Sequence, residues 1–492
     1  MSTSYELLVV GAGPAGVSAA IEAATRGARV LLVEQRPHPG GAIHRAAYDG
    51  GPSAVPMPAR HKKHWAALQR DMAGLSDRIR LLTSAVFLGI DGDGVCMIDS
   101  RAAGRVMLVR PRAVIFAMGA TERAPHVPGW ELPGVVTAGG LQVQLKESGQ
   151  APRGRILVAG NGPLPLALGA QLAAMGNAPV AVLEAAALFR NLWTSPGAVA
   201  GLAAGPRQLL EAAGYFRRLR AARVPYLTGT AVTAVAPAEA VDGAHVGGSL
   251  RVWTRDRCGK GRDYDVDLLV LHGGLACNDR GIPAGDMHGI VIARAGDCNQ
   301  VLGADAALTE GRRVAAGVMS RLAGQGAAAG SVASGAQAAA SAGEAPGGAA
   351  ALFQKSIWRL FEPASTSTST STSTSGPEPA PSPPAATTPD AMPPAPDAVI
   401  CRCEGVTRRA LAKKDLRSAR EIRLVGRVGM GLCQGRYCAH AAGMAAGAGT
   451  ERITLADIDG AIPRWPLRPV SVTALAAAED LGPPRIDEDC PS

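Results

Sequence analysis

Four cysteines in the C-terminal part of the chain have the type and spacing of a metal site. Cys401 and Cys403 form a C-x-C pair, and after a gap of 29 residues Cys433 and Cys438 form a C-x4-C pair. Four thiolates can hold two irons bridged by sulfides, with two ligands to each iron. In a chain of 492 residues with nine cysteines, this paired spacing favours a metal site over a disulfide framework. It predicts a [2Fe–2S] cluster.

Two alternatives to the cluster stay open. Zinc is the main one, because four thiolates also suit a closed tetrahedral site, although zinc ribbons favour wider pairs than C-x-C. The other is a set of unligated cysteines in a protein core. Gly429, Gly431 and Gly435 favour the cluster, since their backbone N–H groups could approach the sulfurs and raise the reduction potential.

A second kind of chemistry is indicated near the N-terminus. An apolar strand, Tyr5–Val10, is followed by the sequence Gly-Ala-Gly-Pro-Ala-Gly at 11–16, a helical stretch, and a strand that ends in Glu34. Glycines here allow the backbone to approach a pyrophosphate at a helix N-terminus, and the acid can bind ribose hydroxyls. This pattern predicts a dinucleotide site. Its candidate residues are Gly11, Gly13, Pro14, Ala15, Gly16, Glu34 and Gln35.

Three further segments favour FAD over NAD. They are the pair Gly40-Gly41, the strand and glycine turn over Val114–Thr121, and Ala295-Gly296-Asp297. Together they resemble the FAD-binding half of the pyridine nucleotide–disulfide oxidoreductase superfamily. The resemblance implies that Gly41 and Gly119 lie near the cofactor and that Asp297 contacts its ribityl–phosphate portion. An ordinary helix cap is the alternative for Asp297.

One departure from that superfamily affects the expected chemistry. Its disulfide reductases carry a redox-active cysteine pair shortly after the acid of the first fold, but Pro39–Tyr48 contains no cysteine. Thiol–disulfide chemistry at the flavin is therefore not expected.

A second glycine loop follows the strand Arg155–Ala159. It contains Gly160 and Gly162, and Glu184 follows 24 residues after the first of them. Pro165 replaces the third glycine, which normally lets the helix pack close to the strand. We expect a Rossmann-like fold at this place. An inert or differently occupied fold is favoured over an NAD(P) site at Gly160, Gly162 and Glu184.

Low-complexity sequence separates three globular blocks. Residues 322–350 are almost entirely Ala, Gly and Ser, and 363–397 run from a Ser-Thr repeat into Pro-rich sequence. The fold class is α/β, with two Rossmann-like folds and a small helical [2Fe–2S] module on a flexible linker. The expected domains are an FAD-binding domain (1–150 and 266–321), a second Rossmann-like domain (151–265), a low-complexity linker (322–350), a docking helix (351–362), a Ser/Thr/Pro-rich linker (363–397) and a [2Fe–2S] domain (399–475).

Charge and hydropathy limit the partners. The net charge is +9, and the 13 Lys and Arg against 6 Asp and Glu between Val399 and Leu475 place much of it in the last module. These arginines are not interleaved with aromatic residues and no nucleic-acid-binding motif is present, so nucleic acid is not an expected partner. We expect no transmembrane segment, because no run reaches about 18 apolar residues. The expected location is the reducing cytoplasm, and contact with the inner face of a membrane through a larger complex is compatible with it.

The wording of several motifs resembles one particular family. Residues 401–404 and 429–438 resemble the bacterioferritin-associated-ferredoxin-type [2Fe–2S] domain. Residues 119–123, 128–140 and the tail at 464–470 resemble the FAD-containing A (alpha) subunit of opine oxidases, hydroxyproline dehydrogenases and hydrogen cyanide synthase. The resemblance covers nearly the whole chain except the two linkers.

This resemblance implies a subunit that carries electrons between FAD and the cluster. Its implied partner is an amine-oxidase-like flavoprotein B (beta) subunit that oxidises an amino acid, imino acid or opine, with an unknown electron acceptor. A stand-alone NAD(P)H-dependent reductase is the first alternative. A non-catalytic iron-binding module is the second. No catalytic triad is readable, so no general base is assigned.

Overall fold

The first half of the fold is a parallel sheet built around the N-terminal strand. Its order is β18 (Val291–Arg294), β7 (Ala113–Phe116), β1 (Leu7–Val10), β2 (Val30–Val33) and β3 (Ile79–Leu82), and all neighbours run parallel. The central strands are apolar throughout, as expected when both faces of a parallel sheet are covered. The computed structural model describes residues 5–123, 125–238, 249–283, 285–327, 348–362, 395–414, 416, 418–431, 433–435, 437–438, 441–442 and 468–480.

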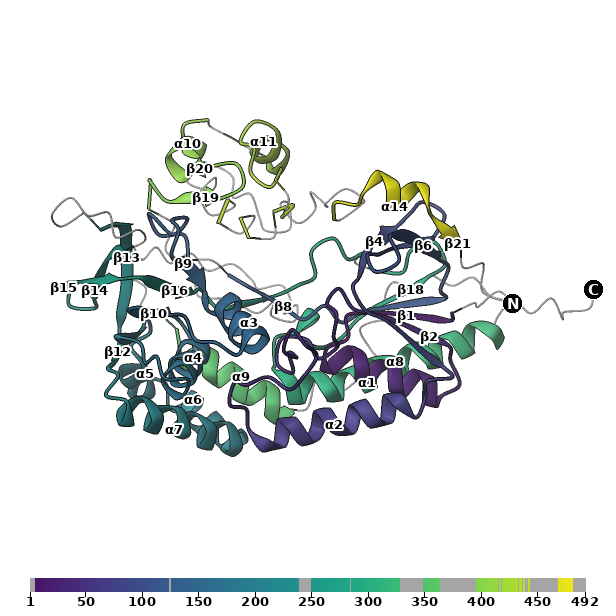
Figure 1. The fold of residues 1–492 in the computed structure, drawn as a ribbon, viewed down its shortest axis with the longest axis horizontal. Coiled ribbons are helices and arrows are strands. Elements are labelled where there is room, and N and C mark those ends of the chain that lie inside the picture. The colour runs from purple at the N-terminus through teal and green to yellow at the C-terminus, as the bar shows by residue number, and fades with distance from the viewer. Residues whose placement is uncertain are drawn as a thin grey trace, which may run out of the picture.

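Three helices cover one face of this sheet, at the bottom of Figure 1. They are α1 (Pro14–Thr25), α2 (Ala59–Ala73) and α8 (Ala304–Ala327). Alanines and Val17 of α1 pack against Ala315 and Val318 of α8 in one core. The opposite face carries β4 (Ala85–Ile90), β5 (Cys96–Ser100) and β6 (Arg105–Val109), which form an antiparallel sheet.

The second half repeats the parallel architecture. Its sheet has the order β12 (Tyr226–Thr228), β11 (Ala181–Glu184), β10 (Ile156–Gly160), β16 (Leu268–His272) and β9 (Val135–Thr137), again with parallel neighbours. The helices α3 (Ala138–Ser148), α4 (Pro163–Ala174) and α7 (Pro206–Ala221) accompany it. An antiparallel sheet of β13 (Thr230–Pro237), β14 (Leu250–Asp256) and β15 (Gly261–Val266) lies between β12 and β16 in sequence. The expected pair of Rossmann-like folds is confirmed.

Two expected domain boundaries need correction. β9 precedes residue 150 but belongs to the second sheet, with α3 packed on it, and β16 follows residue 266 but also belongs to that sheet. The chain therefore enters the second half near Val135 and leaves it after His272. β8 (Ala120–Glu122) and β17 (Leu275–Cys277) form a short antiparallel pair at the place where the chain passes from one half to the other and back.

The segment expected as a docking helix is α9 (Gly348–Leu360), which packs on the second half. It lies against α5 (Leu188–Thr194), α6 (Pro196–Gly201) and the 3-10 turn η1 (Leu202–Ala204). Leu360 and Phe361 are buried there, and Asn191 Nδ2 donates to the Leu360 carbonyl at 2.9 Å. Most of the two expected linkers, residues 328–347 and 363–394, lies outside the described residues.

The cysteine module lies above the two Rossmann halves in Figure 1. Its elements are β19 (Val399–Cys401), β20 (Val406–Thr407), α10 (Arg408–Ala412) and α11 (Ala419–Leu424). A small core of Ile400, Leu411, Ile422 and Val428 holds them together with buried Cys401 and Cys438.

The C-terminal segment returns to the first half. α14 (Val472–Ala476) places Ala474 in a core with Val86, Leu88 and Val106, and β21 (Glu479–Asp480) pairs parallel with β6. The expected module boundary at 475 is therefore revised, since the described residues from Val470 onward pack on the FAD half. No helix of the described ranges combines the length and apolarity needed to cross a bilayer.

Candidate functional site

The candidate FAD residues meet at one edge of the first sheet. The glycine loop follows β1, Glu34 follows β2, Gly119 lies just beyond β7, and Asp297 lies just beyond β18. These are the carboxyl ends of neighbouring parallel strands. The strand order also reverses at β1, with β2 on one side and β7 on the other. Open α/β sheets bind ligands at such a switch point.

Two glycines of the loop are required because other backbone lies against them. A Cβ on Gly11 would lie 2.5 Å from the Ala117 carbonyl oxygen, and a Cβ on Gly16 would lie 1.8 Å from that of Gly11. Gly13 is different, because its Cβ would only meet Gly41 Cα at 3.5 Å, an ordinary contact. Packing within the protein therefore explains Gly11 and Gly16, whereas Gly13 leaves room on the side where a phosphate would approach.

The N-terminus of α1 fits a pyrophosphate. Gly13 is the N-cap, no side chain caps the helix, and Pro14 occupies the first turn without an N–H to satisfy. The uncapped end presents backbone N–H groups and the positive end of the helix dipole. Ala15 packs against the turn that carries Asp297, because a Cβ on Gly296 would lie 2.6 Å from Ala15 Cβ. The residues present fit the phosphate portion of FAD.

Glu34 is buried at the end of β2 and fixes the glycine loop. Its two carboxylate oxygens accept from the N–H of Ala12 at 3.0 Å and of Arg36 at 2.9 Å. Arg45 lies nearby with a buried Nε that has no hydrogen-bond partner. Burial, and then the charge of Arg36, lowers the pKa of Arg45, while Glu147 and Glu34 oppose this. A buried donor that makes no hydrogen bond and only a 3.8 Å ion pair, with Glu147, fits an acceptor on the ribose or adenine of a bound nucleotide.

Asp297 has one oxygen engaged and one available. Its Oδ1 accepts from the N–H groups of Leu302 and Gly303, both at 3.0 Å, so it does cap a turn. Its Oδ2 has no hydrogen bond among the described residues. Burial raises the pKa of Asp297, and the two N–H groups oppose this. The structure is therefore compatible with both interpretations of Asp297. Its Oδ1 caps a turn, and its Oδ2 could bind a hydroxyl of the flavin.

Glu310 is a site residue to which the sequence assigned no contact. It is buried on α8, and its carboxylate accepts from the N–H of Gly296 at 3.1 Å and from Asn299 Nδ2 at 2.7 Å. Burial raises its pKa. It holds the 3-10 turn η3 (Gly296–Cys298) in place and so positions Asp297. The tertiary fold identifies this role, since the sequence placed Glu310 on a helix of the FAD-binding half without giving its carboxylate a partner.

Two expected cofactor residues are less engaged. The side chain of Gln35 is exposed and forms no hydrogen bond with the described part of the chain. Gly119 has a φ of 72° and a carbonyl that accepts from the N–H of Asn278 at 3.1 Å. Asn278 Nδ2 also donates to the Met118 carbonyl at 3.2 Å. Gly119 therefore belongs to a turn that the segment after β17 holds.

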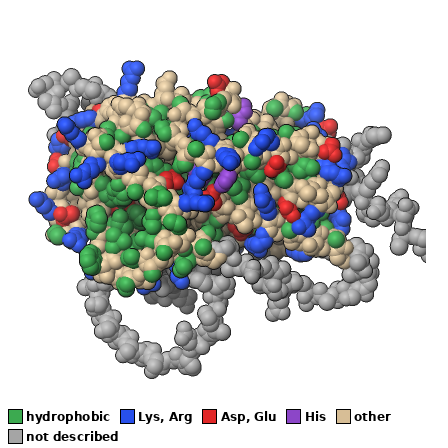
Figure 2. All heavy atoms as spheres, turned by 90° about the horizontal axis from the view of Figure 1, so that it is seen from below, with side chains coloured by type: hydrophobic (Ala, Val, Ile, Leu, Met, Phe, Trp, Pro, Cys, Tyr) green, Lys and Arg blue, Asp and Glu red, His purple; other side chains and the backbone are tan. Residues whose placement is uncertain are grey.

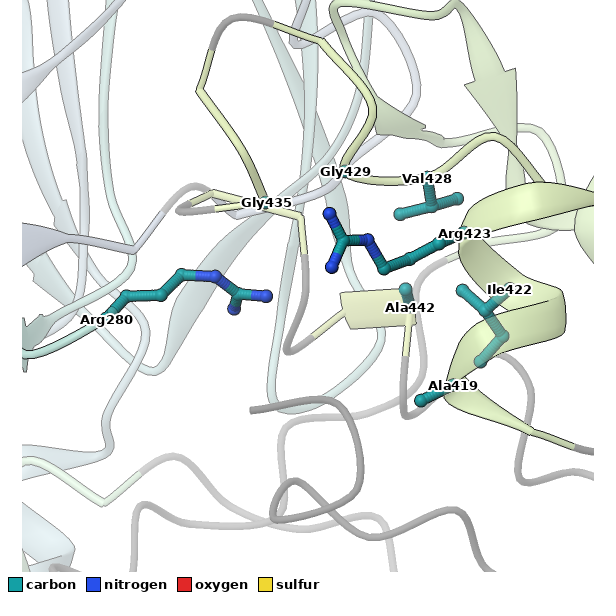
Figure 3. Close-up of a pocket in the computed structure, with 8 residues that line it drawn as sticks. All are labelled: Arg280, Ala419, Ile422, Arg423, Val428, Gly429, Gly435 and Ala442. Atoms are coloured by element: carbon teal, nitrogen blue, oxygen red, sulfur yellow. The ribbon is translucent and has the colours of Figure 1, made fainter. Parts of the chain in front are cut away.

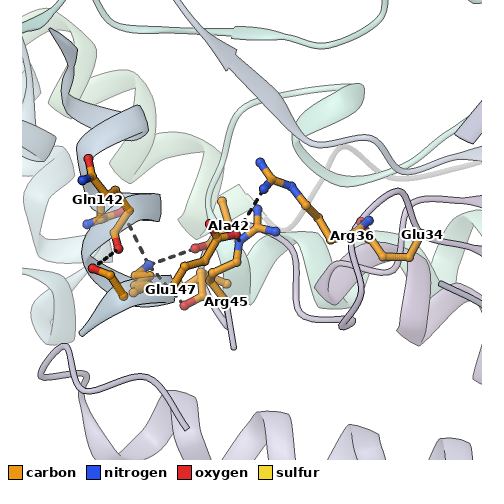
Figure 4. Close-up of polar contacts among 10 residues, drawn as sticks. Glu34, Arg36, Ala42, Arg45, Gln142 and Glu147 are labelled. Carbon is orange, nitrogen blue, oxygen red and sulfur yellow. Dashed lines mark hydrogen bonds and ion pairs between the residues drawn. The ribbon is translucent and has the colours of Figure 1, made fainter. Parts of the chain in front are cut away.

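A buried lysine joins the two halves at the loop after Glu34. Lys146 on α3 donates to the carbonyls of Ala42 at 2.9 Å and Ile43 at 3.3 Å, and Arg36 pairs with Glu147 of the same helix at 3.1 Å (Figure 4). Burial, and then Arg45, lowers the pKa of Lys146 to about 8. These contacts fix the loop that carries Gly41 against the second half.

The second glycine loop reproduces the first. Glu184 accepts from the N–H of Gly162 at 3.0 Å and of Ala186 at 2.9 Å, and Gly162 is the N-cap of α4, which has no side-chain cap. Glu184 is fully buried, and burial raises its pKa to about 8. Pro165 is buried in the first turn of α4 without interrupting it. The fold is retained at this loop, and the expectation for NAD(P) stays open.

A buried acid–histidine pair lies at the carboxyl edge of the second sheet. Glu122 Oε1 is 2.5 Å from His272 Nδ1, and Glu122 Oε2 accepts from the N–H of Gly139 at 2.7 Å. A Cβ on Gly160 would lie 2.4 Å from the His272 carbonyl oxygen. The pair thus links β8, β16 and the start of α3, beside the second glycine loop.

The four candidate cluster cysteines converge in the C-terminal module. Cys438 hydrogen bonds to both Cys401 and Cys433, and Cys403 hydrogen bonds to Cys433. The bond with Cys438 lowers the pKa of Cys401 to about 6 and that of Cys433 to about 5, and the same bonds raise the pKa of Cys438. Burial raises the pKa of Cys403 as well, so that two of the four thiols have lowered pKa values and two have raised ones.

Backbone N–H groups surround these sulfurs. Those of Gly429 and Glu404 donate to Cys401, and those of Gly435 and Tyr437 donate to Cys433. Gly431 also lies against a cysteine, because a Cβ there would lie 2.3 Å from Cys403 Cβ and 3.1 Å from Cys403 Sγ. Among the described residues, no group of three or more His, Cys, Asp and Glu side chains is placed so that it could hold a metal ion. The thiol contacts are pairwise, linking Cys438 to Cys401 and Cys433, and Cys433 to Cys403.

The module is docked on both Rossmann halves. Trp130 Nε1 donates to the Val399 carbonyl at 2.7 Å, and the Arg402 guanidinium lies 5.7 Å from the centre of a Trp130 ring. On the other side Arg280 Nε donates to the Gln434 carbonyl at 3.1 Å. Figure 3 shows Arg280 and Arg423 reaching from opposite sides into a pocket beside Gly435.

Arg468 adds positive charge beside the cysteines. Burial lowers its pKa, and the charges of Tyr437 and Cys433 oppose this, while Arg101 of the first half lowers it further. Arg468 is also part of the expected family tail, of which residues 464–467 lie outside the described residues. It therefore lies between the module and the first half.

Comparison with known proteins agrees with this architecture. Residues 5–297 match the family described as pyridine nucleotide-disulphide oxidoreductase. The A subunit of opine oxidase from Agrobacterium tumefaciens is 30% identical over 97% of this chain and 92% of its own length. The HcnB subunit of hydrogen cyanide synthase from Pseudomonas protegens is 25% identical over 97% of this chain and 98% of its own. L-proline dehydrogenase from P. horikoshii, at 16% identity and a TM-score of 0.55, covers 96% of this chain and 79% of its own, and shares the fold.

Proposed function

We propose that this FAD-dependent oxidoreductase transfers electrons between FAD and a [2Fe–2S] cluster. The premise is that this chain belongs to the pyridine nucleotide-disulphide oxidoreductase family and to the family of the opine oxidase A subunits. The chain transfers these electrons as one component of a dehydrogenase or oxidase complex that acts on an amino acid, imino acid or opine.

One observation carries this proposal. The segment Asn278–Arg280 contacts the turn at Met118–Gly119 at one end and the cysteine loop at Gln434 at the other. A candidate flavin turn and the residue next to Cys433 are therefore connected through three consecutive residues. An electron-transfer subunit requires such proximity, and a free-standing iron store does not.

The chain's own residues have separable tasks in this function. Bound FAD supplies one- or two-electron chemistry. The N-terminus of α1 would hold the pyrophosphate, Glu34 and Arg45 would bind the adenosine portion, and Asp297, positioned by Glu310, would bind the ribityl portion. The four cysteines hold the cluster. The N–H groups of Gly429 and Gly435 stabilise negative charge on the sulfurs and so raise the cluster's reduction potential.

The substrate is assigned to a partner. Among the described residues, neither the glycine loops nor the cysteine module supplies a recognisable clamp for a substrate carboxylate. The names of the relatives contain the word subunit. The proposed partner is an amine-oxidase-like flavoprotein that removes hydride from a carbon–nitrogen bond.

The test is anaerobic purification followed by metal, sulfide and flavin analysis. We expect one FAD, two irons and two sulfides per chain, and an EPR signal of a reduced [2Fe–2S] cluster after dithionite. Zinc in place of iron would refute the cluster. Rapid reduction of the flavin by NADH in the lone chain would favour the stand-alone reductase instead.

A further inference from the structure

One end of the molecule exposes large apolar side chains that the mechanism does not use. Trp193 is 88% exposed, Leu210 is 75% exposed and Phe189 is 61% exposed. Val199, Leu209 and Leu352 are also exposed, and these six residues are called the apolar face here. A tryptophan so accessible is unusual, because its indole removes more apolar area from water than most side chains when buried.

The apolar face is assembled from neighbouring elements. Phe189 and Trp193 are four residues apart on α5 and so share one side of that helix. Val199 is on α6, Leu209 and Leu210 are on α7, and Leu352 is on α9. α9 contacts α5, α6 and η1, and η1 contacts α7. Figure 2 shows hydrophobic side chains gathered over this end, at the left of the view, with Lys and Arg around them.

The same segment is basic. Between residues 188 and 223 there are six arginines, no lysine and one acid, Glu211. That acid is already engaged, since its carboxylate pairs with Arg60 at 3.1 Å and accepts from the Tyr215 hydroxyl at 2.5 Å. The six arginines are exposed and form no ion pair with any described residue. They are Arg190, Arg207, Arg217, Arg218, Arg220 and Arg223.

We propose that the apolar face is the docking surface for a different polypeptide, the flavoprotein partner, which presents an apolar centre with an acidic rim. The inference rests on the proposed function, because it takes this chain to be a subunit. Contiguous exposed apolar surface with Trp and Arg is typical of protein interfaces, where these residues dominate the binding energy.

Charge argues against a second copy of this chain. A two-fold contact would place the same patch on both sides, so exposed arginines would oppose arginines. The construction of the face argues against a membrane, because membrane-lying segments present one long amphipathic helix. Here the apolar residues come from four helices, of which α5 and α6 have seven and six residues.

The test uses co-expression with the amine-oxidase-like flavoprotein of the same host, purified through a tag on this chain. Trp193→Ala and Leu210→Ser should each weaken the complex at least about tenfold by surface plasmon resonance. Trp253→Ala on β14 is the matched control, since it removes an exposed indole outside the apolar face. All variants should keep the flavin absorbance of the wild type, which excludes misfolding.

Each other outcome overturns the inference in a distinguishable way. A complex unaffected by both substitutions would leave the subunit function intact but place the interface elsewhere. If the wild-type chain forms no complex, both the proposed docking surface and the proposed subunit function are wrong. A dimer of the lone chain that Trp193→Ala dissociates would assign the face to a second copy. Flotation of the lone chain with phosphatidylserine–phosphatidylcholine vesicles, lost in Trp193→Ala, would assign it to a membrane.

Discussion

Arg280 Nε donates to the Gln434 carbonyl oxygen at 3.1 Å, across 154 residues of sequence. Gln434 directly follows Cys433, and Arg280 lies two residues beyond Asn278, which holds the turn at Gly119. A single side chain thus fastens the cysteine loop to the half of the molecule that carries the candidate flavin residues. It also brings a positive charge to the loop between Cys433 and Cys438, because a Cβ on Gly435 would lie 3.0 Å from an Arg280 Nη.

We predict that Arg280→Gln slows electron exchange between the flavin and the cluster. Losing the bond lets the module separate from the first half, and losing the charge disfavours the reduced cluster. The cluster potential should fall by on the order of 30 mV, the size expected for a charge interaction near a protein surface. EPR-monitored redox titration and stopped-flow absorbance measure the two effects. Arg255→Gln, an exposed arginine on β14, should change neither.

We predict that Gly13→Val gives a folded protein without FAD. The structure leaves space for a Cβ at Gly13, so the loop can form, but the side chain occupies the approach of the pyrophosphate. Gly16→Ala should instead destabilise the loop itself, because its Cβ would lie 1.8 Å from a carbonyl oxygen. Flavin absorbance and thermal unfolding distinguish the two. A Gly13→Val protein that retains stoichiometric FAD would show that the FAD phosphates do not bind at this loop.

We predict that Cys433→Ser loses the cluster and keeps FAD. Cys433 hydrogen bonds to two of the other candidate ligands, so its loss leaves an incomplete set. Cys258→Ser is the control, since that cysteine is exposed in the turn between β14 and β15. Iron and sulfide content per flavin is the measurement. Equal iron in both variants would contradict the ligand assignment.

We predict that Glu184→Gln changes the pH dependence of stability. Burial raises the pKa of Glu184 to about 8 from an ordinary value of 4.5, so the folded protein holds this proton more tightly than the unfolded chain. The associated stabilisation is complete below about pH 4.5 and is lost as the pH rises through about 8. This stabilisation amounts to a few kcal/mol at most, because each unit of pKa shift corresponds to about 1.4 kcal/mol.

The glutamine side chain of the variant does not titrate. It leaves one of the two N–H groups, of Gly162 or Ala186, without its acceptor, which costs about 1–3 kcal/mol. The variant should therefore be less stable than the wild type at pH 5, and the difference should shrink or reverse by pH 9. Thermal midpoints across this range are the measurement. Tyr226, the neighbouring titratable group, has a pKa raised by burial and titrates above the window. A difference that stays constant with pH would show that Glu184 is charged when folded.

We predict that the isolated chain does not efficiently oxidise amino acids, imino acids or opines. An assay with an artificial electron acceptor and a panel of glycine, proline derivatives and opines should show turnover only when the partner flavoprotein is added. Efficient turnover by the lone chain would place the substrate site here and contradict the subunit function.

Local motifs were readable from the sequence because they depend on short-range backbone geometry. The loops at Gly11 and Gly160, the acids Glu34 and Glu184, and the strand order around them follow from the strand–turn–helix pattern of the Rossmann fold. The spacing of the four cysteines likewise predicted two short pairs that share a cluster, and this remains a prediction.

Long-range pairing was decided only by the tertiary structure. The sequence assigned residues up to Leu475 to the cysteine module, whereas Ala474 packs with Val86, Leu88 and Val106 of the first half, and β21 beyond it pairs with β6. The same holds for β9 and β16 in the second sheet, and for Glu310 behind Asp297. A two-residue strand or a single helical acid carries no periodic pattern. Its place depends on which exposed edge or buried N–H the rest of the fold leaves to be satisfied.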